Sequence, residues 1–600
     1  MADASENPVS ALRELLRRSE CIKAFDLART EVAREPENLA LRHGGVLALA
    51  RMGAIEQARR MYAEWGLDTV TDDEDVLALK GRLLKDEALQ LDGEERRRGL
   101  HAAAAAYRRA FEASGGYFSA INVASLSHLA GDHPAAGKWA AEASRLAAGE
   151  LNYYGRATMA EAAILLGDLP AARQRLQEAV TQKGASLDAR ATTRRQLRML
   201  LGNDGADQRI LKPLEPPAVA HFCGHRLSPE EPGARFPPSR EAEVAAEVSR
   251  LIAGHDIRFS VGSLASGADI IVAEAILERG GILDVVLPFA QEEFIDVSVR
   301  PDGAAWVKRF HRCLAQADDV HFVTHGAYLG HDALFGYASH FALGLARLRS
   351  KSLDAPLHQI AVWDGVPPAP DASAGTAVDV AMGRKVGLMQ HIVSPGGQPA
   401  VAAVDAPVPA VPVDSKERKR RTMVFGDLKG FSKLKDEQIP PYVDHVLGAV
   451  ARVIESHGTH LVFRNTWGDG LFLVFDDVSA AADCAFALQS AMTGLDWQAI
   501  GLPDGMGLRL GMHYGPVFER LDQVLGRRNV FGEHVSRAAR VEPITPEGQV
   551  YATDATAAAL AVDGENRFRC EYVGRLPLAK GYGEFRMYAV SRLRQEGTDV

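Results

Sequence analysis

The spacing of apolar residues changes twice along this chain of 600 residues, and each spacing favours one kind of secondary structure. Through about the first 200 residues, which are rich in Ala, Leu, Arg and Glu, apolar positions recur at helical intervals. From Pro216, short apolar runs alternate with amphipathic helices, and from about residue 421 apolar strands flank Gly-Asp turns. We therefore predict a multidomain protein with an α-helical region, an α/β domain and a final domain that combines strands and helices.

A self-similar motif punctuates the helical region. The segment Leu129–Ala136 reads LAGDHPAA, the segment Leu165–Ala172 reads LLGDLPAA, and their glycines are 36 residues apart. A weaker copy begins at Met52. Such a glycine ends one helix, and the Pro-Ala-Ala run opens the next helix with proline in its first turn. The motif therefore predicts helix pairs that repeat along the chain.

This period and punctuation resemble tetratricopeptide repeats over about residues 20–200. The resemblance implies a helical repeat domain over residues 1–205, a kind of surface that commonly binds a protein partner. A helical layer that serves dimerisation or packing is the alternative.

Five apolar runs, separated by amphipathic helices, dominate the middle of the chain; they begin at Ala218, Arg258, Ile282, Val320 and Gln359. Strands that alternate with helices form a doubly wound parallel sheet. We expect a Rossmann-like domain over residues 216–393, with a last helix within Gly375–Ile392.

Two strand ends of this sheet carry residues suited to a ligand, since ligands of such folds bind at the carboxyl ends of the strands. One is Cys223–Arg226, and the other is Gly262–Asp269, a Gly- and Ser-rich loop whose free N–H groups at a helix start attract anions. This loop and the strand order resemble the SLOG group of Rossmann-like folds, which includes the DNA-processing-A and LOG proteins. The resemblance implies a nucleotide-like ligand. The candidate residues are Gly224, His225, Arg226, Gly262, Ser263, Ser266, Gly267 and Asp269.

Two other interpretations of the middle domain stay open. The glycine-rich turn is also what the fold needs for its geometry alone. A third interpretation makes the domain an enzyme, with His225, Asp269 and Glu274 as candidates, but no clear pair of nucleophile and base supports it.

A Pro- and Ala-rich segment precedes the last domain. Its composition predicts an extended, semi-rigid linker over residues 394–420. The charge run Lys416–Arg421 at its end is typical of a solvated linker end, so we expect the last domain to begin near residue 420.

Two aspartates in the last domain follow apolar strands. Asp427 ends one strand, before a turn at Gly430 and a helix predicted from near Ser432. Asp469 lies in a Gly-Asp-Gly segment between two runs of alternating apolar residues, which predicts the tip of a hairpin. Carboxylates on neighbouring strands can hold a pair of hard divalent cations.

Two further segments complete the pattern. Leu508–Val517 predicts a strand, and Asn529–Arg540 predicts a loop that leads into a helix. Ser536 and Arg540 are four residues apart, so they share one face of this helix. Taken in order, the four patterns resemble the catalytic domain of class III nucleotidyl cyclases. The resemblance implies an α+β, ferredoxin-like domain over residues 421–592.

The resemblance also implies roles for the matching residues. Asp427 and Asp469 match the two aspartates that bind two Mg²⁺ or Mn²⁺ ions, Arg540 matches the arginine that stabilises charge on the α-phosphate, and Lys580 matches a lysine on the triphosphate. The turn that wraps the triphosphate is matched by Leu428, Gly430, Phe431 and Ser432. The ribose 3′-oxygen attacks the α-phosphorus in line, and cations neutralise the departing pyrophosphate. In the family, the aspartates of one protomer face the arginine of the other, which implies a homodimer.

Three positions depart from the family pattern. Ser536 stands where the family has an asparagine, and the two positions that recognise the base are Asn465 and Asn529. A carboxamide both donates and accepts hydrogen bonds, so neither position selects adenine over guanine by charge. ATP is the expected substrate because it is the commonest in the family. Guanylate or pyrimidine cyclase activity is an alternative, and a degenerate cyclase fold that acts as a signalling scaffold is another.

Composition narrows the remaining functions. The net charge of −10, from 68 Lys and Arg against 78 Asp and Glu, does not favour charge-driven binding to nucleic acid. No apolar run approaches the length of a membrane span, and Met1–Glu20 has no apolar segment typical of a secretory signal. The five cysteines lie far apart without a CxxC pair, which fits a reducing compartment. We expect a cytoplasmic protein that binds neither membrane nor nucleic acid.

Overall fold

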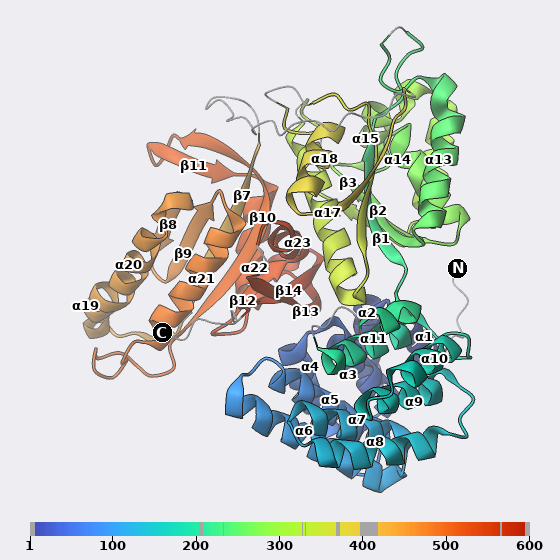
Figure 1. The fold of residues 1–600 in the computed structure, drawn as a ribbon. Coiled ribbons are helices and arrows are strands. Elements are labelled where there is room, and N and C mark those ends of the chain that lie inside the picture. The colour runs from blue at the N-terminus through green and yellow to red at the C-terminus, as the bar shows by residue number, and fades with distance from the viewer. Residues whose placement is uncertain are drawn as a thin grey trace. The chain divides into compact units, whose positions relative to one another are not determined.

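The computed structural model describes residues 7–202, 208–231, 233–326, 328–330, 332–367, 372–396, 418–564 and 567–593. The chain forms two compact units, coloured along the sequence in Figure 1. The first unit contains Met1–Pro216 with the short segments Ser352–Ala355 and Glu571–Gly574. The second unit contains Pro217–Lys351, Pro356–Cys570 and Arg575–Val600. Most of the predicted linker, residues 397–417, lies outside the described residues.

The first unit is built from helices, as the apolar spacing predicts. Its α-helices are α1 (Pro8–Arg17), α2 (Cys21–Arg34), α3 (Leu39–Met52), α4 (Ile55–Glu64), α5 (Glu74–Ala88), α6 (Gly93–Ser114), α7 (Tyr117–Leu129), α8 (His133–Ala147), α9 (Tyr153–Leu165), α10 (Leu169–Ala179) and α11 (Leu187–Leu201).

The repeated motif has the local structure that its residues predict. Gly131 and Gly167 follow α7 and α9 with φ of +87° and +83°, a left-handed conformation that favours glycine. The next residue in each copy, Asp132 or Asp168, accepts a hydrogen bond from a backbone N–H in the first turn of the following helix. The two copies therefore end and begin helices by the same contacts.

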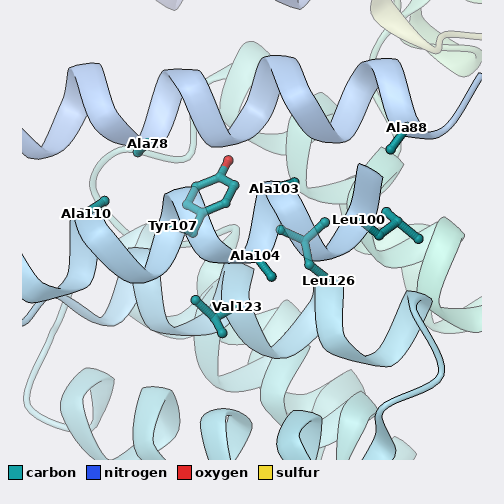
Figure 2. Close-up of a cluster of buried hydrophobic side chains, with 9 residues drawn as sticks. All are labelled: Ala78, Ala88, Leu100, Ala103, Ala104, Tyr107, Ala110, Val123 and Leu126. Carbon is teal, nitrogen blue, oxygen red and sulfur yellow. The ribbon is translucent and has the colours of Figure 1, made fainter. Parts of the chain in front are cut away.

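Small residues let these helices approach closely. Figure 2 shows one buried cluster that joins Tyr107 and several alanines of α6 with Ala78 and Ala88 of α5 and Val123 and Leu126 of α7. A Cβ atom added at Gly81 of α5 would lie 2.5 Å from the ring of Tyr107. The alanine-rich composition of this region thus reflects tight packing between helices.

The second unit begins with a six-stranded sheet whose neighbouring strands are all parallel. Its strands are β1 (Ala218–Gly224), β2 (Ile257–Gly262), β3 (Ile282–Leu287), β4 (Asp319–Phe322), β5 (Leu357–Val362) and β6 (Met389–Val393), in the order β4-β3-β2-β1-β5-β6. Its helices are α13 (Glu241–Gly254), α14 (Ala268–Glu278), α15 (Gln291–Ser298), α16 (Ala304–Gln316), α17 (Ala333–Leu353) and α18 (Thr376–Lys385). The predicted doubly wound sheet is confirmed, and β1 lies at its centre.

The end of this sheet differs from the prediction. The last helix, α18, ends at Lys385, and the second half of the predicted helical segment Gly375–Ile392 forms the sixth strand, β6. This strand carries Gln390 and His391 among three apolar residues and pairs only with β5 at the sheet edge. The prediction of a helix was wrong here because an apolar run this short does not show the alternation that marks a strand, so helix and strand could not be distinguished from the sequence.

The C-terminal sheet is mixed and has eight strands: β7 (Lys419–Lys429), β8 (Leu461–Trp467), β9 (Gly470–Phe475), β10 (Gly507–Asp522), β11 (Arg527–Phe531), β12 (Val550–Thr553), β13 (Phe568–Pro577) and β14 (Glu584–Arg592). The order is β13-β14-β12-β10-β7-β9-β8, and β11 pairs with β10. The accompanying helices are α19 (Ile439–Pro441), a π-helical turn (Tyr442–Leu447), α20 (Gly448–Ser456), α21 (Val478–Thr493), α22 (Glu533–Val541) and α23 (Asp554–Asp563). The predicted α+β domain is confirmed.

Three local predictions in this domain are corrected. The helix expected near Ser432 is only a 3₁₀ turn, Phe431–Lys433, and the first α-helix begins at Ile439. Pro440 and Pro441 lack the N–H that a helix continuing from Ser432 would need at those positions, so they can only open a helix. Asn529 lies in strand β11, not in a loop. The charge run reaches into β7, where Lys419 and Arg421 form ion pairs with one carboxylate on β10, so these charges belong to the sheet. In the described part of the chain, no helix is long and apolar enough to cross a bilayer.

Candidate active site

Strand pairing brings the two predicted metal-binding aspartates together. Asp427 of β7 is paired with Gly470, the first residue of β9. Asp469 is the residue before Gly470 and lies in the two-residue turn between β8 and β9, where Gly468 has a φ of +72°. The side chains of Asp427 and Asp469 are within hydrogen-bonding reach of one another. Burial, together with the charge of Asp427, raises the pKa of Asp469.

A third carboxylate and an arginine surround this pair, and the sequence analysis did not single them out. Arg509 of β10 is the antiparallel partner of Asp427, and its guanidinium donates to the Asp427 carboxylate. The same guanidinium forms an ion pair of 3.0 Å with Glu542, which follows α22. Burial, with Asp427 and Asp469 adding to it, raises the pKa of Glu542 to about 7. Three acidic groups share one cation here, so the cluster favours additional positive charge.

The predicted phosphate turn is fixed to the hairpin tip by aromatic side chains. Gly430 has a φ of +95°, which starts the turn after Asp427. The ring of Phe431 packs on Tyr442 with centroids 4.8 Å apart, and the Tyr442 hydroxyl donates to the carbonyl of Gly468 over 3.2 Å. Burial, and then the charges of both aspartates, raise the pKa of Tyr442 to about 12. Tyr442 is therefore a site residue that the motifs did not reveal.

Helix α22 presents its residues in two different environments. Arg537 is buried, forms a 2.6 Å ion pair with Glu533, and lies over the ring of Phe585. Ser536 is exposed and Arg540 is half-buried. Within the described residues, no hydrogen bond or ion pair joins Ser536 or Arg540 to Asp427 or Asp469. The structure therefore brings the acidic half of the predicted site together but leaves Arg540 outside it within one chain.

Both predicted base-recognition residues have charged partners. Asn465 of β8 accepts a hydrogen bond from Arg527 through Oδ1 over 2.9 Å. Asn529 of β11 donates through Nδ2 to Asp522 over 2.9 Å, and its Oδ1 accepts from the backbone N–H of Val530. These bonds hold Asn465 by its oxygen and Asn529 by both ends of its amide, a restriction that the sequence analysis did not anticipate.

Lys580 lies in the short 3₁₀ turn Ala579–Gly581, is exposed, and has a φ of +60°. The turn is closed by a 2.8 Å bond from the Leu578 N–H to the Gly583 carbonyl. The Tyr582 hydroxyl donates to the carbonyl of Glu533, which connects this turn to the start of α22. The amine is thus presented from a fixed loop beside the helix that carries Arg540.

The parallel sheet has a separate cavity of about 420 Å³ at the carboxyl ends of its strands. Of the second set of candidate residues, those that line it are Gly224, Arg226, Gly262, Ser263 and Asp269. Asp379 of α18, which the sequence analysis missed, lines it as well. Burial raises the pKa of both Asp269 and Asp379 to about 7. Among the described residues, Oδ1 of Asp379 and Oγ of Ser263 have no hydrogen-bond partner.

The other three candidates hold the fold together. His225 is buried, its Nε2 lies 3.0 Å from the carboxylate of Asp364, and its Nδ1 is hydrogen-bonded to Thr376. The Ser266 hydroxyl bonds the carbonyl of Ser298 over 3.1 Å. Gly267 has a φ of +87°, and an added Cβ would lie 2.8 Å from the backbone of Leu227. These contacts give each residue a structural reason to be present.

Comparisons with known proteins assign the two ends of the chain. The family model described as Tetratricopeptide Repeats-Sensor matches residues 18–127, and the model described as Adenylate and Guanylate cyclase catalytic domain matches residues 413–592. The chain thus carries a repeat region of that type at its N-terminus and a class III cyclase catalytic domain at its C-terminus. The SLOG resemblance of the middle domain stays a prediction. No match was found among the curated proteins.

Solved structures of cyclase domains are similar to the C-terminal part. They include the adenylyl cyclase CyaB from P. aeruginosa, at 20% identity over 30% of this chain and 98% of that chain, with a TM-score of 0.27. The guanylate cyclase domain of RhGC from Catenaria anguillulae, solved with GTP, is 19% identical over 30% of this chain and 100% of that chain, with a TM-score of 0.26. The guanylyl cyclase Cya2 is 21% identical over 30% and 96% of the two chains, with a TM-score of 0.26.

Proposed function

We propose that the C-terminal domain is an active cyclase that converts a nucleoside triphosphate, with ATP as the favoured substrate, into a 3′,5′-cyclic nucleotide and pyrophosphate. The observation that supports this proposal is the pairing of Asp427 with Gly470, through which Asp427 and Asp469 come from two neighbouring interior strands and the turn between β8 and β9. The match of the cyclase family model to the same region supports it.

The acidic cluster suits a pair of Mg²⁺ or Mn²⁺ ions. Two carboxylates within hydrogen-bonding reach repel one another unless a proton or a cation lies between them. Oxygen donors of this kind are the ligands that hard divalent cations prefer. Asp427 and Asp469 would hold the ions, which when bound lower the pKa of the ribose 3′-hydroxyl and neutralise the pyrophosphate. Arg509 keeps Asp427 in place through its bond to that carboxylate.

The triphosphate would lie over the turn that follows β7. The backbone N–H groups of Leu428–Ser432 would donate to its oxygens, and Phe431 and Tyr442 would hold that turn beside the two aspartates. Lys580, presented from its fixed turn, would add positive charge to the same phosphates.

We further propose that the working enzyme is a homodimer with shared sites. Arg540 has no hydrogen bond or ion pair to the aspartates within the described residues of its own chain, and α22 presents it half-buried next to the exposed Ser536. An arginine so placed can complete the site of a second protomer, where it would stabilise charge on the α-phosphate.

The rival proposal is a scaffold that binds nucleotide without turnover. The matched residues Asp427, Asp469, Arg540 and Lys580 all persist, which supports activity. The test is incubation of the full-length chain with each of the four nucleoside triphosphates and Mg²⁺ or Mn²⁺, with products resolved by mass. A cyclic product that is lost in Asp427→Ala and Asp469→Ala, both with unchanged thermal unfolding, supports the proposal. Nucleotide binding without product in the wild type supports the scaffold.

A specific observation favours regulation by the middle domain. One side of helix α17 lines the sheet cavity with Phe335, Ala338, Ser339 and Ala342. Its other side contacts the cyclase domain: the Tyr337 hydroxyl donates to the Tyr514 carbonyl over 2.8 Å, and His340 bonds Asp563 over 2.8 Å. A nucleotide-like ligand in the cavity would therefore act on the cyclase through one rigid element. The N-terminal repeats would bind a protein partner.

A further inference from the structure

Three histidines gather in the parallel-sheet domain, away from both sites described above. His255 follows α13, His358 is the second residue of β5, and His391 is the central residue of β6. One ring nitrogen from each lies within 4.8 Å of the others. The closest pair, Nδ1 of His358 and Nε2 of His391, is 2.8 Å apart.

Strand register places two of these side chains on one face of the sheet. His358 is paired with Met389, and Ile360 is paired with His391. Since positions two apart on a strand share a face, His358 and His391 point to the same side. Helix α13 packs against β6, and the residue after it, His255, brings the third ring to within 4.3 Å of the His391 ring centroid. The cluster thus joins three separate segments.

The cluster has nitrogen donors but no acid that would explain it as an ion-pair network. His358 is only 4% exposed. In the part of the chain that the structure describes, no carboxylate lies within ion-pair distance of any of the three rings; the nearby Asp256 is paired with Arg258 at 3.0 Å. Three convergent imidazoles are what a borderline transition-metal ion requires.

We propose that His255, His358 and His391 form a site for a divalent transition-metal ion, with zinc as the preferred ion. Three imidazole nitrogens on a tetrahedral ion with bonds of about 2.1 Å lie about 3.4 Å apart. The 2.8 Å pair needs to open by about 0.6 Å to reach that separation, and exposed His255 needs to move inward. Three protein ligands leave a fourth position for water or an external ligand.

This site differs in chemistry and place from the cyclase cluster. Mg²⁺ prefers oxygen donors, so the cations proposed for Asp427 and Asp469 do not compete for three imidazoles. His358 lies near the start of β5, whereas the sheet cavity lies at the carboxyl ends of the strands. A bound ion would fasten the end of α13 to the β5–β6 edge, and the proposal does not depend on cyclase activity.

The test is metal binding by the full-length chain after removal of metals with a chelator. The protein is dialysed against Zn²⁺ in the presence of excess Mg²⁺, and bound metal is measured by elemental mass spectrometry; Co²⁺ replaces Zn²⁺ for an absorption spectrum that reports tetrahedral coordination. We expect one tightly bound ion per chain. Loss of a residue that only orients a metal-coordinating side chain lowers metal affinity by about 10- to 100-fold. Since His255 and His391 would coordinate the ion directly, His255→Ala or His391→Ala should weaken Zn²⁺ binding by at least that factor.

Two controls keep the result decisive. His101→Ala removes an exposed histidine on α6 and should bind Zn²⁺ like the wild type. His255 is exposed, so His255→Ala should unfold at the wild-type temperature in chelator, yet it should lose the increase in unfolding temperature that Zn²⁺ gives the wild type. Wild-type protein that binds no zinc, or variants that bind it as tightly as the His101→Ala control, would overturn the proposal.

Discussion

The shared-site proposal makes a quantitative prediction for mixtures of two inactive variants. Asp427→Ala removes one proposed metal ligand, and Arg540→Ala removes the arginine proposed for the α-phosphate. Because Arg540 does not contact the aspartates of its own chain in the described residues, a mixed dimer has one site with both lesions and one site with neither. Each variant alone should be inactive.

The expected activity follows from counting sites. Random pairing of equal amounts makes half of the dimers mixed, and each mixed dimer keeps one of its two sites, so about a quarter of the wild-type specific activity should return. The assay is cyclic nucleotide formation after the two variants, carrying different tags, are coexpressed and the doubly tagged dimers isolated. Those purified dimers should then reach about half of the wild-type activity.

A matched mixture provides the control. Asp427→Ala combined with Asp469→Ala leaves every site without one aspartate of the same acidic pair, so no activity should return. The reasoning is refuted if doubly tagged dimers of Asp427→Ala and Arg540→Ala are isolated and stay inactive. It is equally refuted if the mixture of the two aspartate variants recovers as much activity.

Three other predictions concern stability, the base and coupling between domains. Burial raises the pKa of Asp379 to about 7, so between about pH 4 and 7 the folded chain holds a proton there that the unfolded chain has lost. Asp379 should therefore lower the unfolding free energy as pH rises through this range, by up to about 1.4 kcal/mol per pH unit, and Asp269 should add a similar fall. Urea unfolding of Asp379→Asn should show a smaller dependence on pH than the wild type. Neutral amides do not leave a buried charge unpaired when the wrong base binds, so ATP should be preferred over GTP by only about 10- to 100-fold in kcat/KM, about 1.4 to 2.8 kcal/mol. The double variant Asn465→Lys with Asn529→Asp should increase that preference. A pyrimidine nucleotide as the best substrate would contradict this prediction. A Cβ added at Gly344 of α17 would lie 2.5 Å from the backbone of Ala558 in the cyclase domain, so Gly344→Val should change cyclase activity several-fold. Gly254→Val is the control: a Cβ added at Gly254 meets no neighbouring atom within 4 Å, so cyclase activity should stay unchanged.

The spacing of apolar residues correctly predicted the strands wherever the apolar run was long. The first five strands of the parallel sheet and the hairpin around Asp469 follow from residues next to one another in the chain. Strand β6 was missed because its short edge run carries two polar residues. Asn529 was predicted to lie in a loop. It lies in a strand because β11 pairs with β10, and the turn that allows this pairing is not marked by the spacing of apolar residues.

The partners of the site residues could not be predicted, for a different reason. Arg509 faces Asp427 because β10 is antiparallel to β7 in one particular register, and the two residues are 82 positions apart. A shift of one residue would turn Arg509 to the opposite face. Tyr442 and Glu542 likewise reach the site only through tertiary packing. The motifs thus identified candidate residues for the proposed chemistry, whereas strand register and tertiary packing determined which side chains contact them.

The central position of β1 has a consequence for synthesis of the chain. About 130 residues separate the end of β1 at Gly224 from the start of β5 at Leu357, its neighbour on one side. At about 5–20 residues per second, a ribosome needs roughly 7–26 s to make that stretch. During this interval the buried, apolar strand β1 can pair with β2 but exposes its other edge, a template for association with other nascent chains. Shielding of that edge during synthesis would therefore protect the chain from association, whatever the stability of the finished sheet.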